Sequence, residues 1–313
     1  MNGEGAVTGS PSRTHLLTGL EADNLLAFLA LLGLLRALDA VRPEWAARVA
    51  WSGTPPSAEL HFACGVGRED AIAQANTGIH RLGGAYHFDR KDLKYTADEF
   101  RATARDAQRD REHARLVAAL SSDAALKRGS RNEEVAATPL CAMFGQGHQH
   151  FLSRLTEMAH REDKRDEADL EGALFEQWRY QDKTEGFRWD PREDRRYAHQ
   201  SGDPSEARNK IGTVTGANRL AAIGLSVLTS VPTSSGLATL GVSGDRRERR
   251  ICWPIVGTPT SLSGYVALLA HPWLGDEQRA PGLARYGVVA VARARRYQVE
   301  KYFNFERARL QFL

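Results

Sequence analysis

Arginine residues gather in three short stretches of the C-terminal half of the chain, and aromatic residues stand near them. Guanidinium groups donate paired hydrogen bonds to phosphates, and aromatic rings can stack on unpaired bases, so these stretches predict contacts with nucleic acid. The predicted contacts are Arg195 and Arg196; Arg246, Arg247, Arg249 and Arg250; and Arg293, Arg295, Arg296, Lys301, Tyr302 and Phe305. Each stretch taken alone also fits a solvated surface, and rings at strand spacing also fit a core.

Asn218 and Arg219 follow a Gly-Ala pair at the start of an expected helix, and they have two interpretations. Asn218 could cap the helix, which is a structural role that needs no ligand. The start of a helix with an adjacent arginine is also a natural phosphate site. The two interpretations do not exclude each other, and we include both residues among the predicted nucleic-acid contacts.

A metal-dependent nuclease is the competing chemistry, because such enzymes gather histidines and carboxylates around a cation. His148 and His150 lie two residues apart before an expected helix, and they could bind a metal only with ligands from other segments. We favour a polar loop or a helix cap for both. Asp190 and Asp194 stand among arginines that can neutralise them as ion pairs. We therefore predict no catalytic residue, no metal and no cofactor, with the two histidines as the runner-up metal ligands.

The amino-acid composition limits the classes of protein to which this chain could belong. The chain has 313 residues, of which 42% are hydrophobic, and 42 Lys and Arg stand against 39 Asp and Glu. Since the net charge is only +3, any nucleic-acid surface must arise from uneven placement of charge. The three cysteines are far apart and odd in number, which predicts reduced thiols and a cytoplasmic protein. Residues 25–35 are almost wholly apolar but too few to cross a membrane, so we expect a core helix, capped by Asp23 or Asn24, with Arg36 near its negative end.

The remaining pattern predicts an α+β fold with mixed helices and short antiparallel strands. A hairpin is expected at residues 48–51 and 58–62, and strands are expected at residues 237–242, 250–256 and 286–299. Helices are expected at residues 97–126, 149–160, 166–178, 217–228 and 262–270, and residues 127–134 read as a polar loop. Residues 181–215 are rich in turn formers, which indicates an irregular charged loop region in the C-terminal half. The expected organisation is a mostly helical part over residues 1–180 and an α+β part over residues 181–313, unless the two form one continuous domain.

Five short motifs follow one another in the C-terminal half: Trp189-Asp190-Pro191, Asp194-Arg195-Arg196-Tyr197, Asp203-Pro204-Ser205, Gly216-Ala217-Asn218-Arg219-Leu220-Ala221 and Cys252-Trp253-Pro254. Their order resembles a family of CRISPR-associated proteins from type I-G (formerly I-U) loci. That family is described as an extension of the CRISPR helicase-nuclease. The N-terminal Gly19-Leu20-Glu21-Ala22-Asp23-Asn24 is similar to the opening of that family and of the large Cascade subunit from the same loci. The last part, residues 293–305, resembles the basic-aromatic tail of the family.

The resemblance implies a role in RNA-guided antiviral defence. The prediction is a non-enzymatic subunit of a type I interference complex that contacts guide RNA or target DNA, the helicase-nuclease, or both. Its expected partners are the other effector subunits, the nucleic acids and the helicase-nuclease, with no membrane. Two alternatives stay open: a metal-dependent nuclease of the same locus, and a protein-protein adaptor without nucleic-acid contact.

Overall fold

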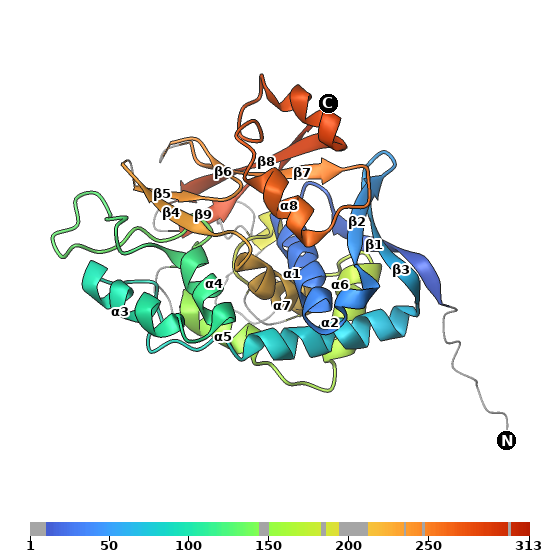
Figure 1. Ribbon diagram of the computed structural model, residues 1–313, viewed down its shortest axis with the longest axis horizontal. Helices are drawn as coiled ribbons and strands as arrows, with labels where there is room; N and C mark the ends of the chain where they lie inside the picture. The colour runs from blue at the N-terminus through green and yellow to red at the C-terminus, as the bar shows by residue number, and fades with distance from the viewer. Residues whose placement is uncertain are drawn as a thin grey trace, which may run out of the picture.

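The computed structural model describes residues 11–143, 150–182, 186–193, 212–234, 236–245, 248–299 and 302–313. Two helices, α1 (Leu25–Val41) and α7 (Thr215–Leu225), lie side by side at the centre (Figure 1). They run antiparallel, because a Cβ atom at Gly33 would overlap the backbone of Leu220 while one at Gly224 would overlap the backbone of Leu29. Glycine at both positions therefore allows the two helix backbones to approach closely.

The sequence correctly predicts α1 as a core helix, since every residue from Leu25 to Leu38 is buried. Asn24 is its N-cap, as expected, and its side-chain oxygen accepts a hydrogen bond from the Leu26 amide at 2.9 Å. The expectation for Arg36 was wrong. The helix continues beyond it to Val41, and Arg36 is buried in an ion pair with Glu112 instead of lying at the helix end.

A three-stranded antiparallel sheet of order β1-β3-β2 covers one side of the helical centre. Its predicted hairpin is confirmed, because β2 and β3 pair around a turn near Pro55. The first strand, β1, was not expected from the sequence. The bounds are β1 (Ser12–Glu21), β2 (Arg48–Ser52) and β3 (Ser57–Val66).

The larger sheet has the order β10-β8-β7-β6, and β9 also pairs with β8. One face packs on α1, where the Trp253 ring stacks on Phe28 with 5.3 Å between ring centres. A separate hairpin joins β4 to β5. The bounds are β4 (Ser230–Thr233), β5 (Gly236–Thr239), β6 (Val242–Ser243), β7 (Arg250–Val256), β8 (Val288–Val299), β9 (Tyr302–Phe305) and β10 (Arg309–Phe312).

The other helices surround this centre, and two of them replace one expected helix. The chain between residues 97 and 126 breaks after Ala107, because Asp110 caps a new helix by accepting hydrogen bonds from the Glu112 and His113 amides. The bounds are α2 (Arg68–Gly83), α3 (Ala97–Ala107), α4 (Arg111–Leu120), α5 (Phe151–Ala159), α6 (Asp166–Phe175) and α8 (Leu262–Leu269).

The fold is α+β, as the sequence predicts. The buried apolar side chains form one cluster that runs from Leu17 to Ala308. Within the described ranges, no helix combines the length and the apolar character that crossing a membrane requires.

Candidate nucleic-acid interface and the buried polar network

Motif residues from distant parts of the chain meet inside the protein. Asn24 donates a hydrogen bond from Nδ2 to Asp190 at 3.0 Å, and the Tyr180 hydroxyl donates to the same carboxylate oxygen at 3.0 Å. Trp253 donates from Nε1 to the Ala22 carbonyl at 3.0 Å. The N-terminal motif therefore holds both the Trp-Asp-Pro and the Cys-Trp-Pro segments in place. These residues have a structural role as cross-links of the fold.

Asn218 is fully buried and does not cap α7, so this part of the sequence prediction was wrong. It lies within the first turn, where its Oδ1 accepts from the Phe187 amide at 3.3 Å and its Nδ2 donates to Thr213 at 2.8 Å. Asp182 accepts a hydrogen bond from the Thr215 amide at 2.7 Å. The carboxylate of Asp182 thus occupies the start of α7, where the sequence also suggested a phosphate site.

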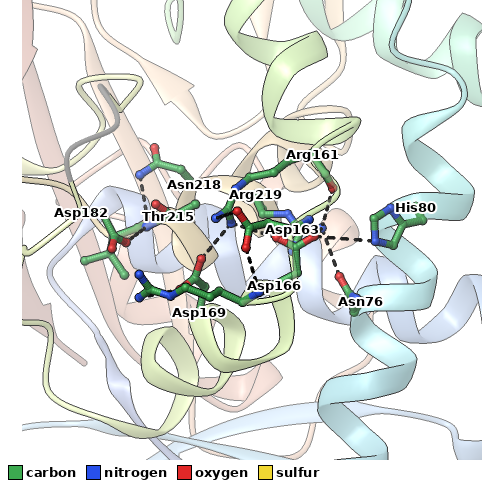
Figure 2. A network of polar contacts seen from close by, with 12 residues as sticks. Asn76, His80, Arg161, Asp163, Asp166, Asp169, Asp182, Thr215, Asn218 and Arg219 are labelled. Carbon is green, nitrogen blue, oxygen red and sulfur yellow. Dashed lines mark hydrogen bonds and ion pairs between the residues drawn. The ribbon is translucent and has the colours of Figure 1, made fainter.

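Arg219 is also fully buried, within a network of polar and charged side chains from α2, α6, α7 and the segment between α5 and α6 (Figure 2). Its guanidinium lies 3.2 Å from Asp166 and donates to Asn76 at 3.0 Å. Burial lowers the pKa of Arg219, and the charge of Asp166 acts against that shift. Arg161 approaches Asp166 at 2.9 Å and Asp169 at 2.8 Å, so Asp166 is paired with two cations. Arg219 has no exposed surface that a phosphate could contact, so its prediction as a nucleic-acid contact was wrong.

Two other predicted contacts on the large sheet lie inside the protein. Arg293 is buried and donates to Gln311 at 2.6 Å and to the Leu274 carbonyl at 3.2 Å. Phe305 is 1% exposed, so its ring packs in the core and is not available to a base. Arg293, Phe305 and Asn218 are therefore not accessible to nucleic acid, and these three predicted contacts were wrong.

Arg296 points to the core face of the same sheet and is partly buried. It donates to the Cys141 carbonyl at 3.2 Å, and its guanidinium lies 3.6 Å from the centre of the Phe303 ring. This predicted contact therefore has a role in packing. Arg249 is also partly buried, and its carbonyl oxygen accepts a hydrogen bond from the Arg296 amide at 2.9 Å.

Among the predicted contacts that the structure describes, Arg250 and Arg295 keep accessible side chains on the large sheet. Arg309, which was not predicted, is exposed on the same face, and we call Arg250, Arg295 and Arg309 the arginine edge. Arg250 on β7 lies directly opposite Arg295 on β8, and Arg309 on β10 lies opposite Arg293. Arg250 pairs with Glu277 at 3.1 Å and Arg295 with Glu306 at 2.5 Å. The hydrogen bond to Glu306 raises the pKa of Arg295, which keeps its charge fixed.

The sequence missed Arg309 because β10 was not expected. The signal that could have found it is the alternation of polar and apolar residues over Arg309–Phe312. Arg309 is exposed and forms no ion pair with any residue that the structure describes.

His150 precedes α5, and its Nδ1 lies 3.1 Å from Asp92. Across the described part of the chain, no group of three or more histidine, cysteine or acidic side chains could hold a metal. Several predicted residues lie outside the described residues, so their placement is open. They are Arg195, Arg196, Arg246, Arg247, Lys301 and His148, and of Tyr302 only the backbone is described.

Comparisons of the chain with protein-family models, with curated proteins and with solved structures found no match.

Proposed function

We propose that the chain is a non-enzymatic subunit of a type I CRISPR interference complex and contacts guide RNA or target DNA through the arginine edge. Its partners are the other effector subunits and the helicase-nuclease. The family resemblance is the first support for this proposal. Three of its motifs, which are far apart in sequence, are joined by hydrogen bonds from Asn24 to Asp190 and from Trp253 to the Ala22 carbonyl. Asn218 of a fourth motif accepts from the amide of Phe187, two residues before Trp189.

The observation that carries nucleic-acid contact is the direct opposition of Arg250 and Arg295 across two paired strands. Like charges in this position destabilise a sheet by a few tenths of a kcal/mol to about 1 kcal/mol. Glu277 and Glu306 offset the repulsion, but Arg309 adds a third cation on the neighbouring strand. Exposed ion pairs contribute little stability, so a phosphate backbone can replace these carboxylates at small cost.

Co-expression with the other effector subunits of a type I-G locus and a guide RNA tests this proposal. We expect the chain to co-purify with the subunits and with RNA, and we expect the isolated chain to leave DNA and RNA uncut in magnesium, manganese or zinc. A chain that joins the subunits but never contacts nucleic acid would instead be an adaptor. Metal-dependent cutting that disappears in His150→Ala would favour the nuclease.

A further inference from the structure

A narrow loop between α4 and α5 projects beyond the helices at the left of Figure 1. Its two arms are joined by hydrogen bonds from the Lys127 amide to the Glu134 carbonyl and from the Ala136 amide to the Ala125 carbonyl, both at 2.7 Å. The Val135 amide donates to the Tyr95 carbonyl at 2.9 Å, which fixes the base of the loop beside the start of α3. We call residues 127–132 the loop tip.

The loop tip has a defined conformation that needs no partner. The Ser130 amide donates to the Lys127 carbonyl at 3.1 Å, and Gly129 has a φ of 77°. This is the arrangement of a type II turn, which requires glycine at its third position and here places Arg128 at its second. The Ser130 hydroxyl accepts from the Asn132 and Glu134 amides, which fixes the chain that follows. A preformed loop loses little conformational entropy when it binds.

The basic residues of this loop lie at its tip. The tip carries Lys127, Arg128 and Arg131 and contains no carboxylate. Lys127 pairs at 3.1 Å with Glu134, which lies directly across the loop from it, and Glu133 and Glu134 follow the tip. Arg128 and Arg131 are exposed, and neither forms an ion pair with a residue in the described ranges. No atom lies within 4 Å of a Cβ placed at Gly129, so the end of the tip is open.

We propose that the loop tip enters the major groove of duplex DNA and that Arg128 and Arg131 contact phosphates on its walls. This inference rests on the proposed function and adds to it a second contact and a class of nucleic acid. The major groove of B-form DNA is about 12 Å wide and admits a two-stranded ribbon. The major groove of an RNA duplex is too narrow and deep for side chains to read. The tip also contains no aromatic residue that could stack on the bases of a single strand.

The test compares Arg128→Ala/Arg131→Ala with Arg13→Ala/Arg48→Ala. Arg13 and Arg48 are exposed, and their strands β1 and β2 lie on the side of the molecule opposite the loop (Figure 1). Both double variants lose two positive charges. Affinity for duplex DNA, duplex RNA and single-stranded DNA is measured over a series of salt concentrations. Each phosphate contact with duplex DNA contributes about 0.9 to the slope of log affinity against log salt. We expect the loop variant to reduce that slope by roughly 1.8 on duplex DNA, the control to leave it unchanged, and Arg128→Lys/Arg131→Lys to retain it.

Equal slopes for the loop variant and its control, with parent-like melting of both, would remove the loop from the interface while leaving nucleic-acid binding by the chain intact. A parent chain that binds none of the three nucleic acids would overturn both this inference and the proposed function. A loop variant that binds duplex DNA normally but loses a co-purifying effector subunit would show that the tip contacts an acidic protein surface instead.

Discussion

Asn24 and Asp190 are joined by a hydrogen bond of 3.0 Å although 166 residues separate them in sequence. Both side chains are buried, and Asn24 also caps α1 through its other side-chain atom. One asparagine thus begins the central helix and anchors the Trp-Asp-Pro segment. Burial raises the pKa of Asp190, and the hydrogen bonds from the Arg192 amide, Asn24 and Tyr180 oppose that shift.

Substitutions of Asn24 separate these two roles. Asn24→Ser keeps a cap for α1 but loses the bond to Asp190, so we expect it to be more stable than Asn24→Ala by about 1 kcal/mol. Asn24→Asp also keeps the cap but places two carboxylates together, and each raises the pKa of the other in the folded state. Stability linked to a raised carboxyl pKa is present at low pH and is lost as the pH rises through the folded-state pKa.

Asn24→Asp should therefore melt well below the parent at neutral pH and approach the parent as the pH falls toward about 4, the ordinary aspartate value. Thermal melting of the parent and the three variants over this pH range is the measurement. A difference between Asn24→Asp and the parent that does not change with pH would contradict the direct contact with Asp190.

The contact between α1 and α7 predicts a contrast among glycines. Gly33→Ala and Gly224→Ala each force a methyl group into the backbone of the other helix, and overpacking of this kind typically costs about 1–3 kcal/mol of unfolding free energy. Gly172→Ala is the matched control, because it lies inside α6 with no atom within 4 Å of the added Cβ. We expect this control to gain up to about 1 kcal/mol from helix propensity. Denaturant unfolding of the three variants measures the contrast, and equal losses in all three would show that the helices are not in close contact.

Arg219 and Asp166 are predicted to depend strongly on each other. Removal of one partner of a buried ion pair leaves the other charge uncompensated and costs about 3–5 kcal/mol. We expect Arg219→Met and Asp166→Asn each to lose stability on this scale, and the double variant to lose less than the sum. A double-mutant cycle with chemical unfolding gives the coupling energy. A coupling near zero would mean that the network of Figure 2 does not hold these two side chains together.

Features of this structure that depend on neighbouring residues could be predicted from the sequence, whereas features that depend on contacts between distant segments could not. The hydrophobic run of α1 and the turn between β2 and β3 are local patterns, and both predictions are confirmed. The burial of Arg219 depends on Asp166, which lies on another helix and is not marked by any local pattern. Helix α2 was not predicted from the sequence. Its buried residues do have helical spacing, but several of them are alanine or glycine, so the apolar face is weak; they are residues 71, 72, 75, 78, 79 and 82.

Thiol chemistry tests the burial of the cysteines. Cys64 is exposed, whereas Cys141 and Cys252 are buried. Burial raises the pKa of Cys141 to about 12 and also raises that of Cys252, which suppresses the reactive thiolate of both. We expect one thiol per chain to react rapidly with a disulfide reagent in the folded protein, three after unfolding, and none rapidly in folded Cys64→Ser. Rapid reaction of a second thiol in the native state would show that the core is open at one of the two buried positions.

The central claim is that the arginine edge contacts nucleic acid, and the salt dependence of binding tests it most directly. The measurement compares the parent with Arg250→Ala/Arg295→Ala/Arg309→Ala on duplex and single-stranded DNA and on guide RNA. Phosphate contacts release counterions, so we expect the triple variant to bind more weakly than the parent. The slope of log affinity against log salt should fall by about 0.7–0.9 for each lost contact, and we expect the loss of roughly two or more contacts. A folded triple variant that binds like the parent at every salt concentration would contradict the claim.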